Sequence, residues 1–355
     1  MALDMSLQFR AVDEPTLGPK WTRCFSRAWP AYRRWFLSEG EALRPTYRQV
    51  VRALRRYMPE LLPNYERMTE LAGGGDFAAR FLGQYCPPPF FAACSQAILL
   101  NPEPVLVRNY DYSPLLCDGL IMNTRWGSRS VIASTDCMSG VLDGMNKSGL
   151  VISLAFGGRR VVDKGFGITL VQRHILESCG NVAEACDELC RIPIQVAYNI
   201  ALVDRHGDHA TVMVSPDRSP IISKTQVSTN HQQGERWEKY TQMIETDTRL
   251  EFLQSTCRNT ELSPDAIVDQ FLTPPLFRNS YAMGYGTIFT AAYFPCRGEA
   301  RYHWKDGSWI QRFDAFKERR RTAVYTDSTA NPDKSPSWPP MPGRTARIPE
   351  GFIAR

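Results

Sequence analysis

One cysteine in the segment PPPFFAACSQAILL, which begins at Pro87, is the strongest candidate for chemistry in this 355-residue sequence. If the bond between Ala93 and Cys94 is cut, Cys94 gains a free α-amine with a pKa of roughly 7.7 to 8.0. That amine lies within reach of its own thiol and can act as a general base without a histidine. The small Ala92 and Ala93 would let a carbonyl approach the thiol for self-cleavage. The alternative is packing, because a free cysteine behaves as a small hydrophobe.

Such a nucleophile needs a carboxylate to orient its ammonium, a cation to balance charge and donors for an oxyanion. The segment RNYDY supplies Arg108 and Asp111, 14 and 17 residues after Cys94. The apolar runs on either side of NPEP predict a hairpin, which would return both side chains to the thiol. Asn230, in STNH at the end of an apolar strand, offers an amide donor. The alternative interpretations are that Arg108 and Asp111 form a surface ion pair and that Asn230 is a turn asparagine.

Other chemistries find less support in the sequence. A GxSxG elbow is absent, so a serine triad of the α/β-hydrolase type is not expected. A papain-like pair of Cys94 and His231 remains an alternative, although the local papain signature is missing. Cys186 and Cys190 have no second cysteine pair to complete a metal site, and HGDH at 206–209 is typical of a turn. GxGxxG and Walker loops are also absent, so we expect neither a metal nor an organic cofactor.

The elements that position these residues change along the chain. Helical periodicity in TYRQVVRALRRYM and NYERMTELA predicts that the first 85 or so residues are helical. Hairpin-linked strands follow from Cys94, then two helices, of which the second (VAEACDELC) is capped by Asn181. More strands, a helical stretch around 235–272 and a last strand pair complete the pattern. This order predicts two antiparallel sheets with helices outside, an α+β layered fold. The proline-rich residues 328–355 are expected to be a flexible tail.

Composition limits the partners that we expect. The net charge is +5, which is mild for this length and does not require a nucleic-acid partner. The sequence has no run of about eighteen apolar residues, so a transmembrane helix is not expected. The start, MALDMSLQFRAVDEP, lacks the apolar region of a secretory signal. We therefore expect a cytoplasmic protein whose ten cysteines are mostly free thiols.

The segments ACSQA, RNYDY, DGMNKSGLVISLAFGG, STNH and YGTIFTAAY occur in an order and spacing that resemble a known family. That family is the isopenicillin-N acyltransferases, self-processing N-terminal-nucleophile (Ntn) hydrolases related to the choloylglycine hydrolases. The resemblance extends from about residue 40 to about residue 315. It implies an αββα four-layer fold and cleavage just before Cys94. A small chain, 1–93, would stay bound to a large chain, 94–355, whose catalytic region is 94–327.

By this resemblance, Cys94 is the nucleophile and carries the base, Arg108 and Asp111 line its site, and Asn230 contributes to the oxyanion hole. The implied chemistry is hydrolysis or transfer of an acyl group through a thioester, from a small-molecule acyl amide or acyl thioester. A coenzyme A thioester is one candidate substrate, although no phosphate-binding motif supports it. A binding protein that keeps the fold without the chemistry is a further hypothesis.

Three features depart from the family pattern. Ala93 stands where glycine is common, which removes some backbone freedom at the cleavage site. Ala155 stands where choloylglycine hydrolases often have asparagine, so a backbone N–H would have to serve instead. The family also uses a later arginine near the active site, for which Arg278 and Arg301 are the candidates.

Overall fold

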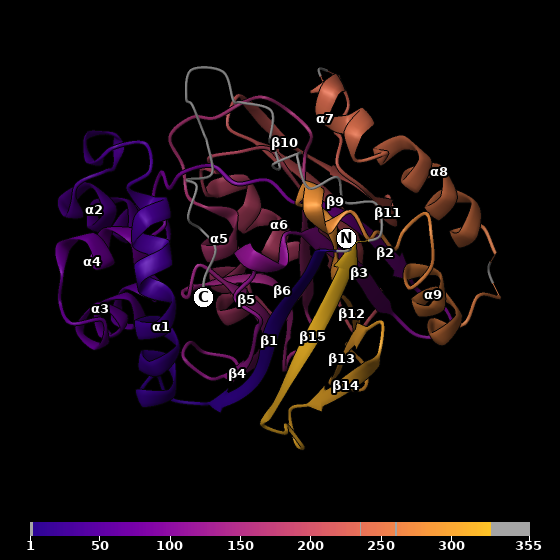
Figure 1. Cartoon of the computed structure of the whole chain (residues 1–355), viewed down its shortest axis with the longest axis horizontal. Coiled ribbons are helices and arrows are strands. Elements are labelled where there is room, and N and C mark those ends of the chain that lie inside the picture. The colour runs from indigo at the N-terminus through magenta and orange to yellow at the C-terminus, as the bar shows by residue number, and fades with distance from the viewer. Residues whose placement is uncertain (1–2, 235, 260, 328–355) are drawn as a thin grey trace.

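The computed structural model describes residues 3–234, 236–259 and 261–327, in which two β-sheets lie face to face with helices outside them (Figure 1). The predicted tail, 328–355, lies outside the described residues. No helix in the described part of the chain is long and apolar enough to cross a membrane.

The larger sheet has nine strands. In spatial order they are β10 (Arg218–Ser223), β9 (His209–Ser215), β8 (Tyr198–Val203), β7 (Val151–Phe156), β6 (Gly140–Asn146), β5 (Val131–Asp136), β4 (Leu120–Thr124), β1 (Leu3–Glu14) and β15 (Arg319–Asp327). Neighbours are antiparallel except β1 and β4, which are parallel.

The smaller sheet has six strands, all antiparallel to their neighbours. In spatial order they are β11 (Val227–Ser228), β2 (Ala93–Leu99), β3 (Val105–Tyr112), β12 (Gly286–Phe294), β13 (Glu299–Trp304) and β14 (Gly307–Arg312). Every residue of β2, β3 and β12 is buried. These strands have helices on one face and the larger sheet on the other, which explains their nearly continuous apolar sequences.

Helices cover the outer face of each sheet. Helices α5 (Ile168–Ser178) and α6 (Val182–Arg191) pack on the larger sheet, and α8 (Thr246–Cys257) and α9 (Pro264–Phe271) pack on the smaller one. Because β2 also contacts β7, and β12 contacts β6, the layers follow the order α, β, β, α. Helix α7 (Glu238–Met243) leads into α8. The predicted Asn181 cap of α6 is confirmed, since its side chain accepts the Glu184 N–H at 3.0 Å.

The N-terminal segment combines helices with one long strand. Helices α1 (Pro19–Phe36), α2 (Tyr47–Tyr57), α3 (Leu62–Leu71) and α4 (Asp76–Leu82) gather at one side of the molecule, drawn in indigo in Figure 1. Within the described residues there are also four short 3-10 helices: η1 (Glu41–Leu43), η2 (Pro59–Leu61), η3 (Pro114–Leu116) and η4 (Tyr281–Met283).

The prediction of a wholly helical N-terminus is wrong for Leu3–Glu14. This segment is β1, which lies between β4 and β15 in the larger sheet. Its side chains alternate around Met5, Phe9 and Ala11, which are buried, and this is the period of a half-buried strand.

Candidate active site

Cys94 is the second residue of β2, and the hairpin partner β3 returns the RNYDY segment beside it. In the register of the two strands, Ala93 lies opposite Asp111 and Gln96 lies opposite Arg108. In the structure, Arg108 and Asp111 therefore lie close to Cys94, as the hairpin predicts. Because side chains alternate along a strand, Cys94 and Arg108 point between the sheets, whereas Asp111 points toward the outer helices.

The thiol of Cys94 is held by a buried cation. Arg108 donates from Nη2 to Cys94 Sγ at 3.3 Å and from Nη1 to Asp143 of β6. The Asp143 carboxylate also accepts from Ser134 at 2.6 Å and from the Tyr293 hydroxyl. This network joins both sheets, and its orientation of Arg108 fixes a positive charge at the sulfur.

Electrostatics in the intact chain favour the protonated thiol. Burial raises the pKa of Cys94, Arg108 lowers it, and Asp111 raises it again, with burial the largest of these effects. A thiol in this position needs a nearby base to become a good nucleophile, since the thiolate is the reactive form.

The backbone on both sides of the predicted cleavage bond is also held. Asn230 accepts the Cys94 N–H at 2.8 Å through Oδ1. Its Nδ2 donates to the carbonyl oxygens of Ala92 at 3.2 Å and Phe156 at 3.1 Å. The hydroxyl of Tyr240, on α7, donates to the same Ala92 carbonyl at 3.0 Å. The Asn230 amide and the Tyr240 hydroxyl therefore fix the peptide group that precedes the bond between Ala93 and Cys94.

Arg249 of α8 is a site residue that the sequence analysis missed. Its Nη1 donates to the Cys94 carbonyl at 2.6 Å and to Ser95 Oγ at 2.8 Å, and its Nη2 donates to Asn230 Oδ1 at 3.0 Å. The guanidinium lies 3.9 Å from Asp111 Oδ2. Burial lowers the pKa of Arg249 to about 10, against the opposite effect of Asp111.

Arg278 and Arg301, the two candidates from the sequence for a later arginine near the active site, lie in different surroundings. Arg278 is buried beside the C-terminal end of α7, where its charge lowers the pKa of Asp111. Arg301, on β13, pairs instead with Glu299 at 2.6 Å and Asp265 at 2.7 Å. Arg249 is the arginine that bonds directly to the nucleophile's backbone.

Asp111 is a fully buried carboxyl with one oxygen in use. The Thr287 hydroxyl donates to Oδ1 at 2.7 Å, whereas Oδ2 has no hydrogen-bond partner among the described residues. Burial raises the pKa of Asp111, and Arg249 and Arg278 lower it. The carboxyl therefore keeps an acceptor oxygen available for another donor at this edge of the site.

His231 contacts the start of α8 rather than Cys94 in the described structure. Its Nδ1 lies 3.2 Å from Thr246 Oγ1 and 4.0 Å from Asp247 Oδ1, both at the start of α8. The side chains that bond to Cys94 in the described structure are those of Asn230, Arg249 and Arg108. This geometry gives no support to a Cys94–His231 pair.

The STNH segment is positioned from β8. Asn199 donates from Nδ2 to the carbonyl oxygens of Thr229 and His231, each at 2.9 Å. Ala155 lies opposite Asn199 in the larger sheet. Asn199 thus supports the loop that carries Asn230 and is a second residue that no motif indicated.

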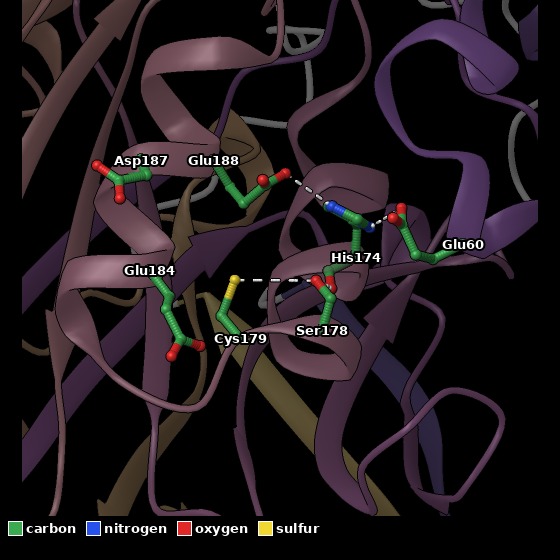
Figure 2. A pocket seen from close by; sticks show the side chains of 7 residues that line it. All are labelled: Glu60, His174, Ser178, Cys179, Glu184, Asp187 and Glu188. Atoms are coloured by element: carbon green, nitrogen blue, oxygen red, sulfur yellow. Dashed lines mark hydrogen bonds and ion pairs between the residues drawn. The ribbon is translucent and has the colours of Figure 1, made fainter.

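A separate pocket of about 240 Å³ lies over α5, α6 and η2 (Figure 2). Its lining residues are Glu60, His174, Ser178, Cys179, Glu184, Asp187 and Glu188. His174 lies between two carboxylates, with Nε2 2.8 Å from Glu188 and Nδ1 3.9 Å from Glu60. None of these residues belongs to the Cys94 site. In the described part of the chain, no group of three or more His, Cys, Asp or Glu side chains is arranged to hold a metal ion.

Residues 100–309 match the family model described as acyl-coenzyme A:6-aminopenicillanic acid acyl-transferase. The match spans more than half of the 355 residues, and the chain belongs to this family. It includes Arg108, Asp111 and Asn230 and begins six residues after Cys94. Family membership and the α, β, β, α layers confirm the predicted Ntn-hydrolase fold. No curated protein sequence matches the chain.

The chain is also similar to solved structures, including the following three. A C2A mutant of conjugated bile acid hydrolase from Clostridium perfringens has a TM-score of 0.44 and 10% identity, covering 64% of this chain and 96% of that one. Penicillin V acylase from Agrobacterium tumefaciens has a TM-score of 0.44 and 12% identity, with coverages of 64% and 90%. The Caenorhabditis elegans ortholog of N-acylethanolamine-hydrolyzing acid amidase has a TM-score of 0.41 and 17% identity, with coverages of 61% and 99%.

Proposed function

We propose that this chain is a self-cleaving cysteine Ntn amidohydrolase or acyltransferase that carries an acyl group as a thioester on Cys94. The observation behind the proposal is that three parts of Cys94 each meet a different buried side chain. Its N–H meets Asn230, its carbonyl meets Arg249 and its thiol meets Arg108. Such complete fixing of one residue is expected of a preorganised nucleophile and exceeds what packing of a small apolar side chain requires.

Self-cleavage would begin with attack of the Cys94 thiol on the carbonyl carbon of Ala93. A C–S bond forms, the C–N bond breaks, and the thiol proton passes to the Cys94 nitrogen. Water then hydrolyses this thioester, which gives Ala93 a carboxyl group and restores the thiol. Asn230 and Tyr240 support the step by holding the Ala92 carbonyl, because fixing the peptide next to the attacked Ala93 carbonyl lowers the entropic part of the barrier.

Turnover would then use the new α-amine as the base. The amine takes the thiol proton, and the thiolate forms beside the Arg108 guanidinium. The thiolate attacks the substrate acyl carbon, and the Cys94 ammonium returns the proton to the departing amine or thiol. Water or a second amine releases the acyl group from sulfur. Asn230 Nδ2 supplies an oxyanion donor once Ala92 has left it.

Asp111 and Arg249 would control the charge of the amine. The free Oδ2 of Asp111 is buried at the strand position opposite Ala93. It accepts a hydrogen bond from the ammonium that cleavage creates. The Arg249 guanidinium lies 3.9 Å from Asp111 Oδ2 and balances the charge of that carboxylate. Arg249 also keeps the Cys94 carbonyl in place, so the Cys94 amine rotates about a fixed backbone.

The substrate class that we infer is a small-molecule acyl amide or acyl thioester. The family description names an acyl-coenzyme A and the amine 6-aminopenicillanic acid. The similar solved structures are named for conjugated bile acids, penicillin V and N-acylethanolamines. These compounds share an acyl group on nitrogen or sulfur, which is the bond that a Cys94 thioester mechanism exchanges.

The first test is the intact mass of the purified, denatured wild-type chain. Two masses, for 1–93 and 94–355, are expected. A single mass for 1–355 in both wild type and Ala93→Gly would overturn the self-cleavage proposal. Release of an aryl amine from acyl anilides by the cleaved protein then tests turnover, and labelling of Cys94 by a thiol probe separates an enzyme from a binding protein.

A further inference from the structure

Asp111 accepts a short hydrogen bond from Thr287, a residue of the YGTIFTAAY segment on β12. The Thr287 hydroxyl donates to Asp111 Oδ1 at 2.7 Å, and both side chains are buried. Hydrogen bonds to a carboxylate are charge-assisted and are among the stronger ones in proteins. Thr287 thus contacts the carboxyl group that we expect to orient the Cys94 ammonium.

The backbone of Arg278 fixes the direction of this hydrogen bond. The Arg278 N–H donates to Thr287 Oγ1 at 2.9 Å, so the hydroxyl oxygen is already used as an acceptor. The hydroxyl has one proton to donate, and it donates that proton to Asp111 Oδ1. The Thr287 N–H donates in turn to the Arg278 carbonyl at 2.7 Å, which holds Thr287 in place. This arrangement leaves Asp111 Oδ2 without a hydrogen-bond partner among the described residues.

A β-bulge places Thr287 on the same face of the smaller sheet as Asp111. Phe289 lies opposite Tyr110 of β3, and Thr287 lies opposite Asp111, the next residue of β3. Ile288, between Phe289 and Thr287, has no counterpart on β3 and is the extra residue of the bulge. In a regular strand Thr287 and Phe289 would share one face, because side chains two residues apart point to the same side. The bulge turns Thr287 to the face of Asp111, and bulges beside active sites often re-aim a side chain in this way.

Titratable groups face Asp111 from each element that packs around it. Burial is the largest effect on the pKa of Asp111 and raises it, whereas four groups lower it: Arg249 of α8, Arg278, the Thr287 hydroxyl and Arg108 of β3. The charge of Asp111 in turn raises the pKa of Cys94 on β2, Tyr240 on α7 and Tyr281 on η4. Arg249 lies 3.9 Å from Oδ2, which is too long for a hydrogen bond. Among the described residues, the orientation of the carboxyl group is therefore set by its bond to Thr287.

We propose that Thr287 is a positioning residue, which holds Asp111 so that Oδ2 receives the α-ammonium group of Cys94. This inference rests on the proposed function of Cys94. Ala93 lies opposite Asp111 on the hairpin, so the cut leaves the new amine beside this carboxyl group. By stabilising the carboxylate, the Thr287 hydroxyl also lowers the proton affinity of the amine and carboxylate together. The amine is therefore available as the base at a lower pH than without Thr287.

The pH profile of acyl-anilide hydrolysis by the cleaved protein tests this role. Thr287→Val removes the hydroxyl and keeps the shape of the side chain. The acid limb of its kcat/KM profile should move to higher pH by about one unit, the effect of one hydrogen bond to a charged group. Thr287→Ser keeps the donor and should restore the wild-type limb. An unchanged limb in Thr287→Val would overturn the proposal.

Thr290→Val is the matched control for this substitution. Thr290 is a buried threonine of the same strand, and its hydroxyl donates to the uncharged Asn109 side chain at 2.6 Å. Its loss removes a buried hydrogen bond of the same kind without touching Asp111. The acid limb of Thr290→Val should therefore coincide with that of the wild type. A shift as large as that of Thr287→Val would mean that both substitutions act through the sheet, which would also overturn the proposal.

A second measurement needs neither cleavage nor turnover. In the Cys94→Ala background, Thr287→Val should lower the urea midpoint more at pH 8 than at pH 5, because the lost donor bonds to a carboxyl group that ionises as pH rises. Thr290→Val should lower the midpoint equally at both pH values. A decrease for Thr287→Val that does not depend on pH would overturn the proposal. Failure of the proposed function gives a different result, in which the wild type stays a single chain while the pH-dependent decrease persists; Thr287 then holds Asp111 but no ammonium group.

Discussion

Asn230 Oδ1 accepts the main-chain N–H of Cys94 at 2.8 Å across a separation of 136 residues. The same carboxamide donates through Nδ2 to the Ala92 carbonyl, so one side chain holds the backbone on both sides of Ala93. Arg249 fixes the carboxamide by donating to Oδ1 at 3.0 Å. The orientation of the bond to be cleaved is therefore set from the loop after β11 and from α8, rather than by the hairpin alone.

Replacing Asn230 with aspartate should slow self-cleavage by roughly 30-fold, because two hydrogen bonds of about 1 kcal/mol each that hold the backbone around the cleavage bond are lost. The carboxylate keeps an acceptor for the Cys94 N–H but loses both donors to Ala92 and Phe156. The measurement is the half-time for appearance of the large chain after refolding or synthesis. Asn101→Asp, at an exposed turn, should cleave at the wild-type rate. Normal cleavage of Asn230→Asp would show that the amide donors are not needed.

Cys94→Ala should leave a single chain of 1–355 and no amidase activity, because the nucleophile of both reactions is removed. Intact mass and an acyl-anilide assay measure the two results. Cys137→Ala is the matched control, since Cys137 is another buried thiol that is given no covalent step; it should still be cleaved. A cleaved and active Cys94→Ala protein would refute the mechanism.

Tyr240→Phe should affect self-cleavage more than turnover. Its hydroxyl donates to the Ala92 carbonyl at 3.0 Å, and that contact concerns only the chain being cut. Loss of one hydrogen bond of about 1 kcal/mol predicts a cleavage rate roughly fivefold lower, with kcat of the cleaved protein nearly unchanged. Tyr57→Phe serves as the control. An equal loss in both rates would show instead that Tyr240 supports the substrate step.

Arg249→Met should lower the free energy of unfolding by about 3 to 5 kcal/mol, because it leaves the buried Asp111 carboxyl without its nearest cation. It also removes donors to Cys94, Ser95 and Asn230. Urea unfolding measures the change. Arg67→Met removes an exposed pair with Glu70 and should cost less than about 1 kcal/mol. Similar losses in both variants would mean that Arg249 is effectively solvated.

The Asp118–Asp136 pair, whose carboxyl groups both contact the Tyr32 hydroxyl, should make the folded protein less stable as pH rises. Burial raises the pKa of both carboxyls, to about 8 for Asp118, so the folded state binds more protons than the unfolded state above about pH 4. Stability due to the pair is complete below that pH and is lost up to about pH 8. Urea unfolding at pH 5 and 8 should therefore show a larger decrease in wild type than in Asp118→Asn/Asp136→Asn, by more than about 1 kcal/mol. Equal decreases in the free energy of unfolding of the two proteins would contradict the raised carboxyl pKa values.

The hairpin part of the site could be predicted from sequence because its geometry is local. Arg108 and Asp111 follow Cys94 across one tight turn, so strand alternation and the turn signal were enough to bring them together. The later contacts are not local. Tyr240 and Arg249 lie on helices, where a polar residue is normally solvated, and their roles depend on how α7 and α8 pack over β2.

The motifs left Arg278 and Arg301 both open for the same reason, since residue type alone does not indicate which side of the smaller sheet each arginine occupies. Similarly, β1 alternates like a strand, but its partners are β4 and β15, more than 100 and 300 residues away. Without those partners, a short alternating segment before four helices is not distinguished from the helical region by its sequence.

The position of β1 also determines what dissociation of a cut chain would do. β1 lies between β4 and β15 (Figure 1). If residues 1–93 left after cleavage, β15 would lose the neighbour that it has among the described strands, and β4 would present a bare strand edge. Unpaired edges of this kind recruit strands from other molecules and lead to aggregation. The two products would therefore behave as an obligate heterodimer. The large chain, produced separately, should precipitate rather than stay soluble.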